Sequence, residues 1–340
     1  MFAPAVLVPG FPLERRKGRG SGDSELNPLL GIHHVTAIAG DPRGNVDFYT
    51  RVLGLRLVKK TVNFDDPGTY HLYYGDEVGH PGTIMTFFPW PDAARGRRGV
   101  GQVTTTSFAV PPASLGYWSQ RLKAHRVPVE PAAAFGEDAL AFDDPDGLKL
   151  ELVGEADGTD RPGRSGGPVP AEHAVRAFSH VTLVEQGFDA TAKLLVDVMG
   201  FRRTAESGNR FRFMLGAGGA ATRVEVRCTP DAPPGRIAVG TVHHVAWRVA
   251  GPTEQREWRE RLVGRGLDVT PVLDRSYFRS IYYREPGGVL FEIATDPPGF
   301  TVDEPPDRLG TALQLPPWLA PYRARIEAAL PPLPPPSARV

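Results

Sequence analysis

The tripeptide His-His-Val occurs twice in this chain, as His33-His34-Val35 and as His243-His244-Val245. Each copy lies in a strand-like run, which is followed by a helix-like run, a glycine or turn, and two or three further strand-like runs. This β-α-β-β-β order occurs four times, in units that open near Gly31, Gln102, Ala177 and Thr241. Duplicated polar residues inside duplicated strands predict a metal site shared between repeats.

The spacing within the units is regular. In three units a histidine is separated from a later glycine by 20 residues: His34 and Gly54, His180 and Gly200, His244 and Gly264. Each glycine follows an amphipathic stretch, where glycine is the usual helix terminator. We therefore predict an α+β fold in which four βαβββ modules form two open, mixed β-barrel domains.

Composition excludes several classes of protein. At 340 residues the chain is long enough for two domains. Basic and acidic residues number 39 each, so no charge excess attracts nucleic acid or an anionic membrane. The single cysteine, Cys228, excludes an internal disulfide. We find no apolar run near the roughly 18 residues of a membrane span and no signal peptide, so we expect a cytoplasmic protein.

Glycine, proline, serine and charged residues crowd at three places, which we interpret as boundaries. Residues 1–30 are predicted to be a flexible leader and residues 154–172 an interdomain linker. The proline-rich extension at 301–340 includes a short helix, Tyr322–Leu330, that we expect to dock on the body. Two modules then fall in each domain, N-terminal at 31–153 and C-terminal at 173–300.

Alternation along each strand predicts which side chains face the barrel. His34 and His244 should point inward, because their apolar neighbours take the side that packs on the helix. In the last strand Glu292 lies between Phe and Ile, which pack outward and send the carboxylate inward. A buried carboxylate is costly unless it is paired or binds a metal. Tyr282, on the strand before, also faces inward.

Two imidazoles and one carboxylate form a facial triad. Such a triad leaves adjacent positions open and suits a non-haem Fe(II) that binds substrate and dioxygen together. We predict His34, His244 and Glu292 as the ligands and favour Fe(II) over Mn(II) or Zn(II). A structural zinc site is disfavoured because no cysteine ligand is present. The alternative is that both histidines are hydrogen-bonded core residues.

The repeats resemble the vicinal oxygen chelate superfamily, which includes glyoxalase I, antibiotic-resistance binding proteins and extradiol ring-cleaving dioxygenases. Over residues 30–332 the chain is similar to the dioxygenases that act on hydroquinones, through the segments Gly31–Thr36, Tyr70–Asp76, Pro81–Trp90 and Leu315–Leu319. This resemblance implies His34, His244 and Glu292 as iron ligands and Tyr282 as an acid–base residue. It also implies four residues around them: His33, Thr36, His243 and Arg275. Regular strands would turn His33 and His243 away, so a bulge or a contact across the domain interface is required.

A rival ligand set exists within the same fold. His180 opens the third unit, and with His244 and Glu292 it would join the third and fourth units. We favour His34, because its histidine doublet matches the hydroquinone subgroup. Glu151 follows a turn at the spacing by which Glu292 follows its own turn, but its unit opens with threonines. We therefore expect Glu151 to be a vestigial or structural carboxylate.

The triad and the resemblance predict an Fe(II)-dependent extradiol-type dioxygenase that inserts O2 into a hydroquinone or catechol-like ring. A small aromatic substrate and O2 would be its partners, and a homo-oligomer is compatible with the sequence. Phe87, Phe278 and Phe300 suggest an aromatic pocket. Two other classes stay open, because a fold alone does not specify function. A glyoxalase- or epimerase-type lyase or isomerase would prefer a fourth protein ligand and consume no oxygen, and a non-catalytic resistance protein would sequester an aromatic drug without metal.

Overall fold

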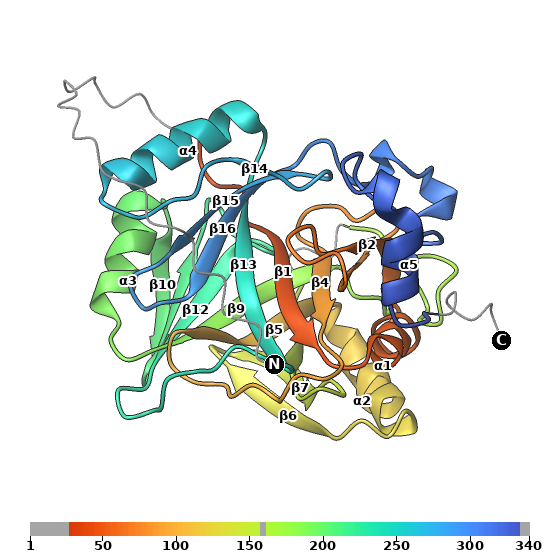
Figure 1. The fold of residues 1–340 in the computed structure, drawn as a ribbon. Helices are drawn as coiled ribbons and strands as arrows, with labels where there is room; N and C mark the ends of the chain where they lie inside the picture. Colours follow the sequence, from red (N-terminus) through yellow and green to blue (C-terminus); the bar gives the residue numbers. More distant parts are fainter. Residues whose placement is uncertain (1–26, 157–160, 334–340) are drawn as a thin grey trace.

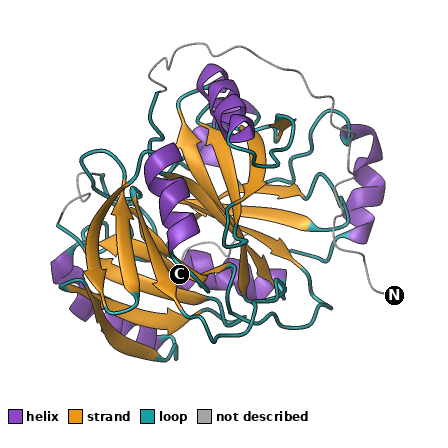
Figure 2. Ribbon diagram, turned by 90° about the vertical axis from the view of Figure 1, so that its left-hand side faces the viewer, coloured by secondary structure: helices purple, strands orange, loops and turns teal. Residues whose placement is uncertain are grey.

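The strands form two eight-stranded sheets, each curled into an open half-barrel with helices on its outer surface (Figure 1, Figure 2). This computed structural model describes residues 27–156 and 161–333. Most of the expected leader, residues 1–26, therefore lies outside the described part of the chain. The predicted architecture of four βαβββ modules in two open mixed barrels is confirmed.

The first sheet combines the first and fourth units. Its strand order is β14-β15-β16-β13-β1-β4-β3-β2, and β1 and β13 run antiparallel side by side at its centre (Figure 1). These two strands carry the two His-His-Val copies. The strands are β1 (Ile32–Ala39), β2 (Arg56–Val62), β3 (Tyr70–Gly75), β4 (Ile84–Pro89), β13 (Thr241–Val249), β14 (Leu273–Asp274), β15 (Arg279–Arg284) and β16 (Leu290–Thr295).

The second sheet combines the second and third units in the order β10-β11-β12-β9-β5-β8-β7-β6. Here β5 and β9 form the antiparallel centre. The strands are β5 (Gln102–Val110), β6 (Val129–Ala134), β7 (Glu137–Asp143), β8 (Lys149–Gly154), β9 (Ala177–Glu185), β10 (Arg202–Ser207), β11 (Arg210–Met214) and β12 (Arg223–Cys228).

This pairing differs from the one expected from chain order. We expected the two units on each side of residues 154–172 to share a domain, but each sheet takes one unit from either half. Pairing satisfies the backbone groups that the edge of a single unit would expose, and local sequence does not specify which unit is the partner. The expected linker also packs on the first unit: Arg161 donates to the Pro81 carbonyl at 3.2 Å, and Val169 is buried beside Gly54.

The helices cover the outer faces of the sheets. Gly54 and Gly200 have positive φ angles of 72° and 80°, as expected of helix terminators. In the fourth unit Gly264 is still helical, and Gly266 takes this role with φ 83°. The helices are α1 (Pro42–Asp47), α2 (Leu115–Ala124), α3 (Asp189–Lys193), α4 (Pro252–Gly264) and α5 (Arg323–Ala329), with π-helical turns at Phe48–Val52 and Leu194–Val198 and 3-10 turns at Pro112–Ser114, Phe300–Val302, Pro306–Arg308 and Ala320–Tyr322.

The apolar outer faces of the strands pack with the helices in one large core, as the alternation predicts. Val35, Trp247 and Phe291 are fully buried there, and burial of each such side chain contributes about 1.5–3 kcal/mol. Phe87 also belongs to this outer core, 4.6 Å from the Tyr49 ring. Our expectation that Phe87 lines an aromatic pocket is therefore wrong, because it lies on the helix-packing side of its strand.

A smaller apolar cluster fills the inner face of the first sheet and includes Tyr73, Phe278 and Phe300. The C-terminal extension docks on the same sheet, as expected, with Ile326 and Leu330 buried in the outer core. In the described part of the chain, no helix is both long and apolar enough to span a membrane.

Candidate metal centre

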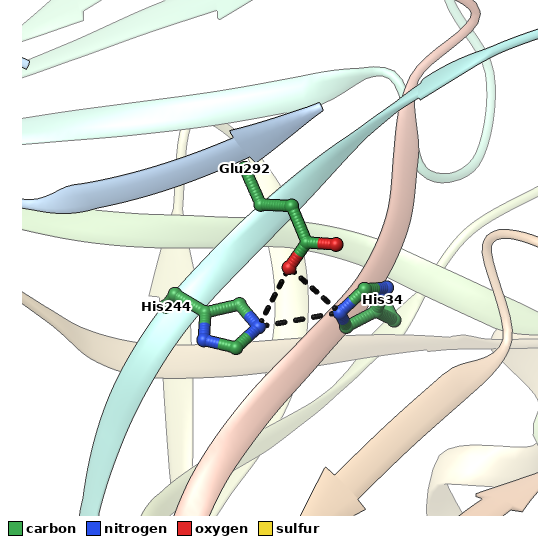
Figure 3. Close-up of side chains that lie close together, drawn as sticks. All are labelled: His34, His244 and Glu292. Carbon is green, nitrogen blue, oxygen red and sulfur yellow. Dashed lines mark hydrogen bonds and ion pairs between the residues drawn. The ribbon is translucent and has the colours of Figure 1, made fainter. Parts of the chain in front are cut away.

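Three ligating side chains converge inside the first half-barrel (Figure 3). His34 comes from β1, His244 from β13 and Glu292 from β16. The two Nε2 atoms lie 3.3 Å apart, and Glu292 Oε2 lies 2.9 Å from His244 Nε2 and 3.3 Å from His34 Nε2. The side chains are 2%, 5% and 0% exposed, respectively. Residues more than 200 positions apart in the sequence thus present their lone pairs to one point.

A β-bulge lies beside each ligand histidine. In the register between β1 and β13, the extra residue is His33 on one strand and His243 on the other. A bulge bends the strand and re-aims a side chain, so both residues stay beside the ligands rather than on the opposite face. His33 Nδ1 lies 3.0 Å from His34 Nδ1, and His243 Nδ1 lies 2.8 Å from His244 Nδ1.

These short contacts suit histidine rings that carry their proton on Nδ1. A histidine that ligates through Nε2 carries its proton on Nδ1 and donates it to a neighbour. Burial, together with His34, lowers the pKa of His33 well below its ordinary value. Burial and His244 lower the pKa of His243 to about 3. Both neighbours are therefore neutral, and each accepts through Nδ1 from the ligand beside it.

His244 and Glu292 have the charge states that a bound cation requires. Burial lowers the pKa of His244 against the opposing effect of Glu292. For Glu292, burial alone would raise the pKa, but His34 and His244 outweigh it and hold that pKa well below its usual range. Ser280 Oγ donates to Glu292 Oε1 at 2.5 Å, whereas Oε2 has no hydrogen-bond partner of suitable geometry among the described residues. A fully buried carboxylate oxygen facing two imidazoles fits a bound metal.

Tyr282 and Arg275 lie beside this group. Tyr282 on β15 pairs with Glu292 across the sheet, and its ring lies 5.6 Å from that of His244. The Arg275 guanidinium lies 5.5 Å above the Tyr282 ring and 3.1 Å from Asp65 Oδ2. Burial and Glu292 raise the pKa of Tyr282, so the phenol keeps its proton. Thr36 is also inside, paired with His244.

Sequence reasoning missed three polar side chains at this centre. Thr86 of β4 and His71 and Tyr73 of β3 form hydrogen bonds with Thr36 and with one another. Alternation along the third strand-like run could have placed His71 and Tyr73 on one face. The pairing of Thr86 with Thr36 depends on the parallel contact of β4 with β1 and could not be read from the sequence.

Aromatic rings surround the group. Phe278 lies 4.9 Å from the His34 ring and 5.1 Å from the His33 ring. Phe300, as expected, lies on the inner face of the sheet. Phe88 rather than its neighbour Phe87 approaches the site, with its ring 4.2 Å from that of His71.

The rival ligand set is not assembled, because His180 lies on β9 in the second sheet. There its Nε2 lies 3.2 Å from Ser107 Oγ, 3.5 Å from Glu225 Oε1 and 4.0 Å from Glu151 Oε2. Ser107 donates to Glu151 at 2.8 Å, and Arg212 donates to Glu225 at 2.7 Å. In this second barrel, therefore, the Arg212 guanidinium neutralises Glu225, and the Ser107 hydroxyl donates a hydrogen bond to Glu151.

The register shows that the second barrel is a copy of the first. Glu151 pairs with Ser107 as Glu292 pairs with Ala246, so the two glutamates correspond. By the same register His180 corresponds to His34, while Thr105 stands where the first barrel has His244. The copy therefore lacks one imidazole.

The chain matches the family model described as "Glyoxalase/Bleomycin resistance protein/Dioxygenase superfamily" over residues 31–152 and 177–293. The chain belongs to this superfamily. The superfamily includes the vicinal oxygen chelate fold found here, and the matched ranges span all four units. A crystal structure of maize (Zea mays) glyoxalase I shares this fold, with a TM-score of 0.58 at 15% identity over 78% of this chain and 92% of that one.

Nearer relatives of this superfamily member are named as dioxygenases. It is 47% identical over 301 residues to "Putative ring-cleaving dioxygenase MhqO" of Bacillus subtilis (strain 168), covering 88% of this chain and 96% of the relative. It is 38% identical over 298 residues to "Chlorohydroquinone/hydroquinone 1,2-dioxygenase" of Sphingobium indicum, covering 85% and 92%. A crystal structure described as a "putative dioxygenase from Bacillus subtilis" superposes with a TM-score of 0.87 at 46% identity, covering 90% of this chain and 98% of that one.

Proposed function

We propose that this superfamily member is an Fe(II)-dependent, extradiol-type ring-cleaving dioxygenase that acts on a hydroquinone or catechol-like aromatic. The observation that carries the proposal is the buried meeting of two imidazoles with one carboxylate whose Oε2 faces both rings. Such a set is typical of non-haem Fe(II) oxygenases, which need adjacent open positions for two reactants. The names of the relatives support the same class of reaction.

In this proposal His34, His244 and Glu292 hold the metal. When bound, Fe(II) supplies a site at which electron density passes from an ionised aromatic ring to dioxygen. His33 and His243 accept hydrogen bonds from Nδ1–H of the two ligand histidines. These bonds keep the Nε2 lone pairs of the ligands turned inward.

Other side chains act on the substrate. Tyr282 keeps its proton and can donate a hydrogen bond to a substrate oxygen. The Arg275 charge, beside Tyr282, stabilises negative charge on that oxygen or on a ring substituent. Phe278 and Phe300 provide an apolar wall that excludes water and packs against an aromatic ring.

The ligand set favours this reaction over a glyoxalase-type lyase. A lyase of that type would prefer a second glutamate as a fourth ligand. By register, the position on β4 that corresponds to Glu225 holds Thr86, whose hydroxyl is bonded to Thr36. Among residues 27–156 and 161–333, three ligating side chains gather at this centre.

Oxygen consumption tests the proposal. Protein purified anaerobically and loaded with Fe(II) is expected to take up about one O2 per hydroquinone consumed, as measured with an oxygen electrode alongside catechol and gentisate. Glu292→Gln should abolish uptake, whereas the matched change in the second barrel, Glu151→Gln, should retain it. Conversion of a substrate without oxygen uptake, or equal activity in the Glu292→Gln protein, would contradict the proposal.

A further inference from the structure

Four side chains form a continuous hydrogen-bonded chain that starts beside the ligands. Thr36 Oγ1 on β1 lies 3.1 Å from Thr86 Oγ1 on β4. Thr86 Oγ1 lies 2.7 Å from His71 Nε2, and His71 Nδ1 lies 2.8 Å from the Tyr73 hydroxyl. Thr36 follows His34 by two positions on the same face of β1, so the chain runs from the metal centre to β3.

We propose that Tyr73 and His71 are a proton relay for the aromatic substrate, an inference that rests on the proposed function. The phenolic oxygen of the substrate gives its proton to the Tyr73 oxygen while Tyr73 gives its own proton to His71 Nδ1. One substrate O–H bond breaks and one N–H bond forms on the imidazole. Tyr73 ends with the proton count it began with, and no electron moves. The substrate is left as the anion that a cationic centre binds.

The threonines can accommodate the tautomer that this relay requires. If His71 Nε2–H donates to Thr86, then Thr86 donates in turn to Thr36, and His71 Nδ1 is left as an acceptor for Tyr73. Every contact in the chain then has one donor and one acceptor. The opposite tautomer would leave His71 with no lone pair facing Tyr73.

The surroundings keep the relay in its resting state. Burial lowers the pKa of His71 well below its ordinary value, so the imidazole is a neutral acceptor. Burial raises the pKa of Tyr73 well above its ordinary value, so the phenol holds its proton. The charged and titratable groups that bear on His71 and Tyr73 come from five other segments: His34 of β1, His244 of β13, Glu292 of β16, Arg275 in the loop before β15, and Tyr282 of β15.

The four side chains of this hydrogen-bonded series differ in their exposure to solvent. Tyr73, Thr86 and Thr36 are at most 1% exposed, whereas His71 is partly exposed. Tyr73 shares the inner apolar cluster with Phe278, which packs on His34, so its phenol lies among the rings that would hold an aromatic substrate.

Two substitutions separate a relay from a purely structural hydrogen bond. Tyr73→Phe removes the hydroxyl alone, and His71→Gln keeps hydrogen bonding but removes the base. We expect kcat for O2 uptake to fall about 100-fold in each, with iron content and melting temperature near those of the parent. The matched control is Tyr283→Phe, a buried tyrosine on the outer face of β15 whose hydroxyl bonds Met199 Sδ. It should keep kcat within about two-fold.

A second readout does not depend on oxygen. Nitrohydroquinone, whose phenolate absorbs visible light, is mixed anaerobically with the iron-loaded protein at mildly acidic pH. The parent should bind it ionised, and the Tyr73→Phe and His71→Gln proteins should bind it protonated. Variants that ionise the probe and keep parental kcat would overturn the relay, even if the parent consumes oxygen as proposed. Ionisation by the parent but not by the variants, without oxygen uptake by any of them, would leave the relay standing and contradict the proposed function.

Discussion

At the scale of single residues, the two histidines of each doublet have different roles. His34 and His244 present Nε2 to the centre. His33 and His243 accept hydrogen bonds from the Nδ1–H groups on the other side of these rings. The second barrel has a serine in the corresponding place, since Ser179 Oγ lies 2.8 Å from His180 Nδ1. In the proposed centre each doublet pairs a ligand with a residue that orients it, which would explain why two adjacent histidines occur twice.

Replacement of His33 tests this division. His33→Ala removes the acceptor for His34 Nδ1–H, so the ring is no longer held in the ligating tautomer. We expect metal affinity to weaken about 10- to 100-fold, as measured by competition with a chelator. The matched Ser179→Ala change in the second barrel should leave that affinity unaltered. Equal metal affinity in the His33→Ala protein would show that the doublet has no orienting role.

At the scale of elements, residue patterns within the strands predicted which side chains face inward but not which strands pair. Alternation along β1, β13 and β16 correctly placed the apolar residues outward and the side chains of His34, His244 and Glu292 inward. The pairing of β1 with β13 could not be predicted, because it joins segments about 200 residues apart. The local sequence of each strand does not distinguish this partner from the first strands of the other units. For the same reason the contact of Thr86 with Thr36, through which His71 joins the centre, could not be predicted from the sequence.

The C-terminal extension is attached to β2 by a buried charge. Lys59 is fully buried, and its Nζ lies 2.5 Å from both Asp303 Oδ1 and Glu304 Oε2. Lys59→Met would leave the buried Glu304 carboxylate uncompensated, so we expect the free energy of unfolding to fall by about 3 kcal/mol. Urea denaturation measures this change. Lys60→Met, one position along and half-buried, is the control with an expected loss below about 1 kcal/mol. Equal losses in both proteins would contradict the assignment.

At the scale of the whole molecule, turns from each sheet pack against the other. Glu185, at the end of β9, is buried against Gly287 and Glu285 in the turn between β15 and β16. In the reciprocal contact, Asp144 in the turn between β7 and β8 accepts from the Tyr49 hydroxyl at 3.1 Å. Burial raises the pKa of Asp144 to about 7. The sheets are thus joined through acidic groups that favour their protonated forms.

This junction predicts a loss of stability in alkali. Burial and Glu285 raise the pKa of Glu185 to about 8. In the unfolded chain the group ionises near 4.3, so folding stability is greatest below that pH and declines as pH rises through about 8. Glu185→Gln removes the ionisation. It should be more stable than the parent by up to about 5 kcal/mol at pH 9 and by no more than about 1 kcal/mol at pH 5. A parallel pH dependence of stability in the two proteins would refute this account.

In the proposed function the first and last units jointly hold one metal ion. Metal analysis of anaerobically purified protein tests it most directly, with His244→Ala and Glu292→Ala beside the parent and Glu151→Ala as the matched control. We predict about one iron per chain in the parent and in Glu151→Ala, and almost none in the other two. Full iron content in the His244→Ala and Glu292→Ala proteins would contradict the account.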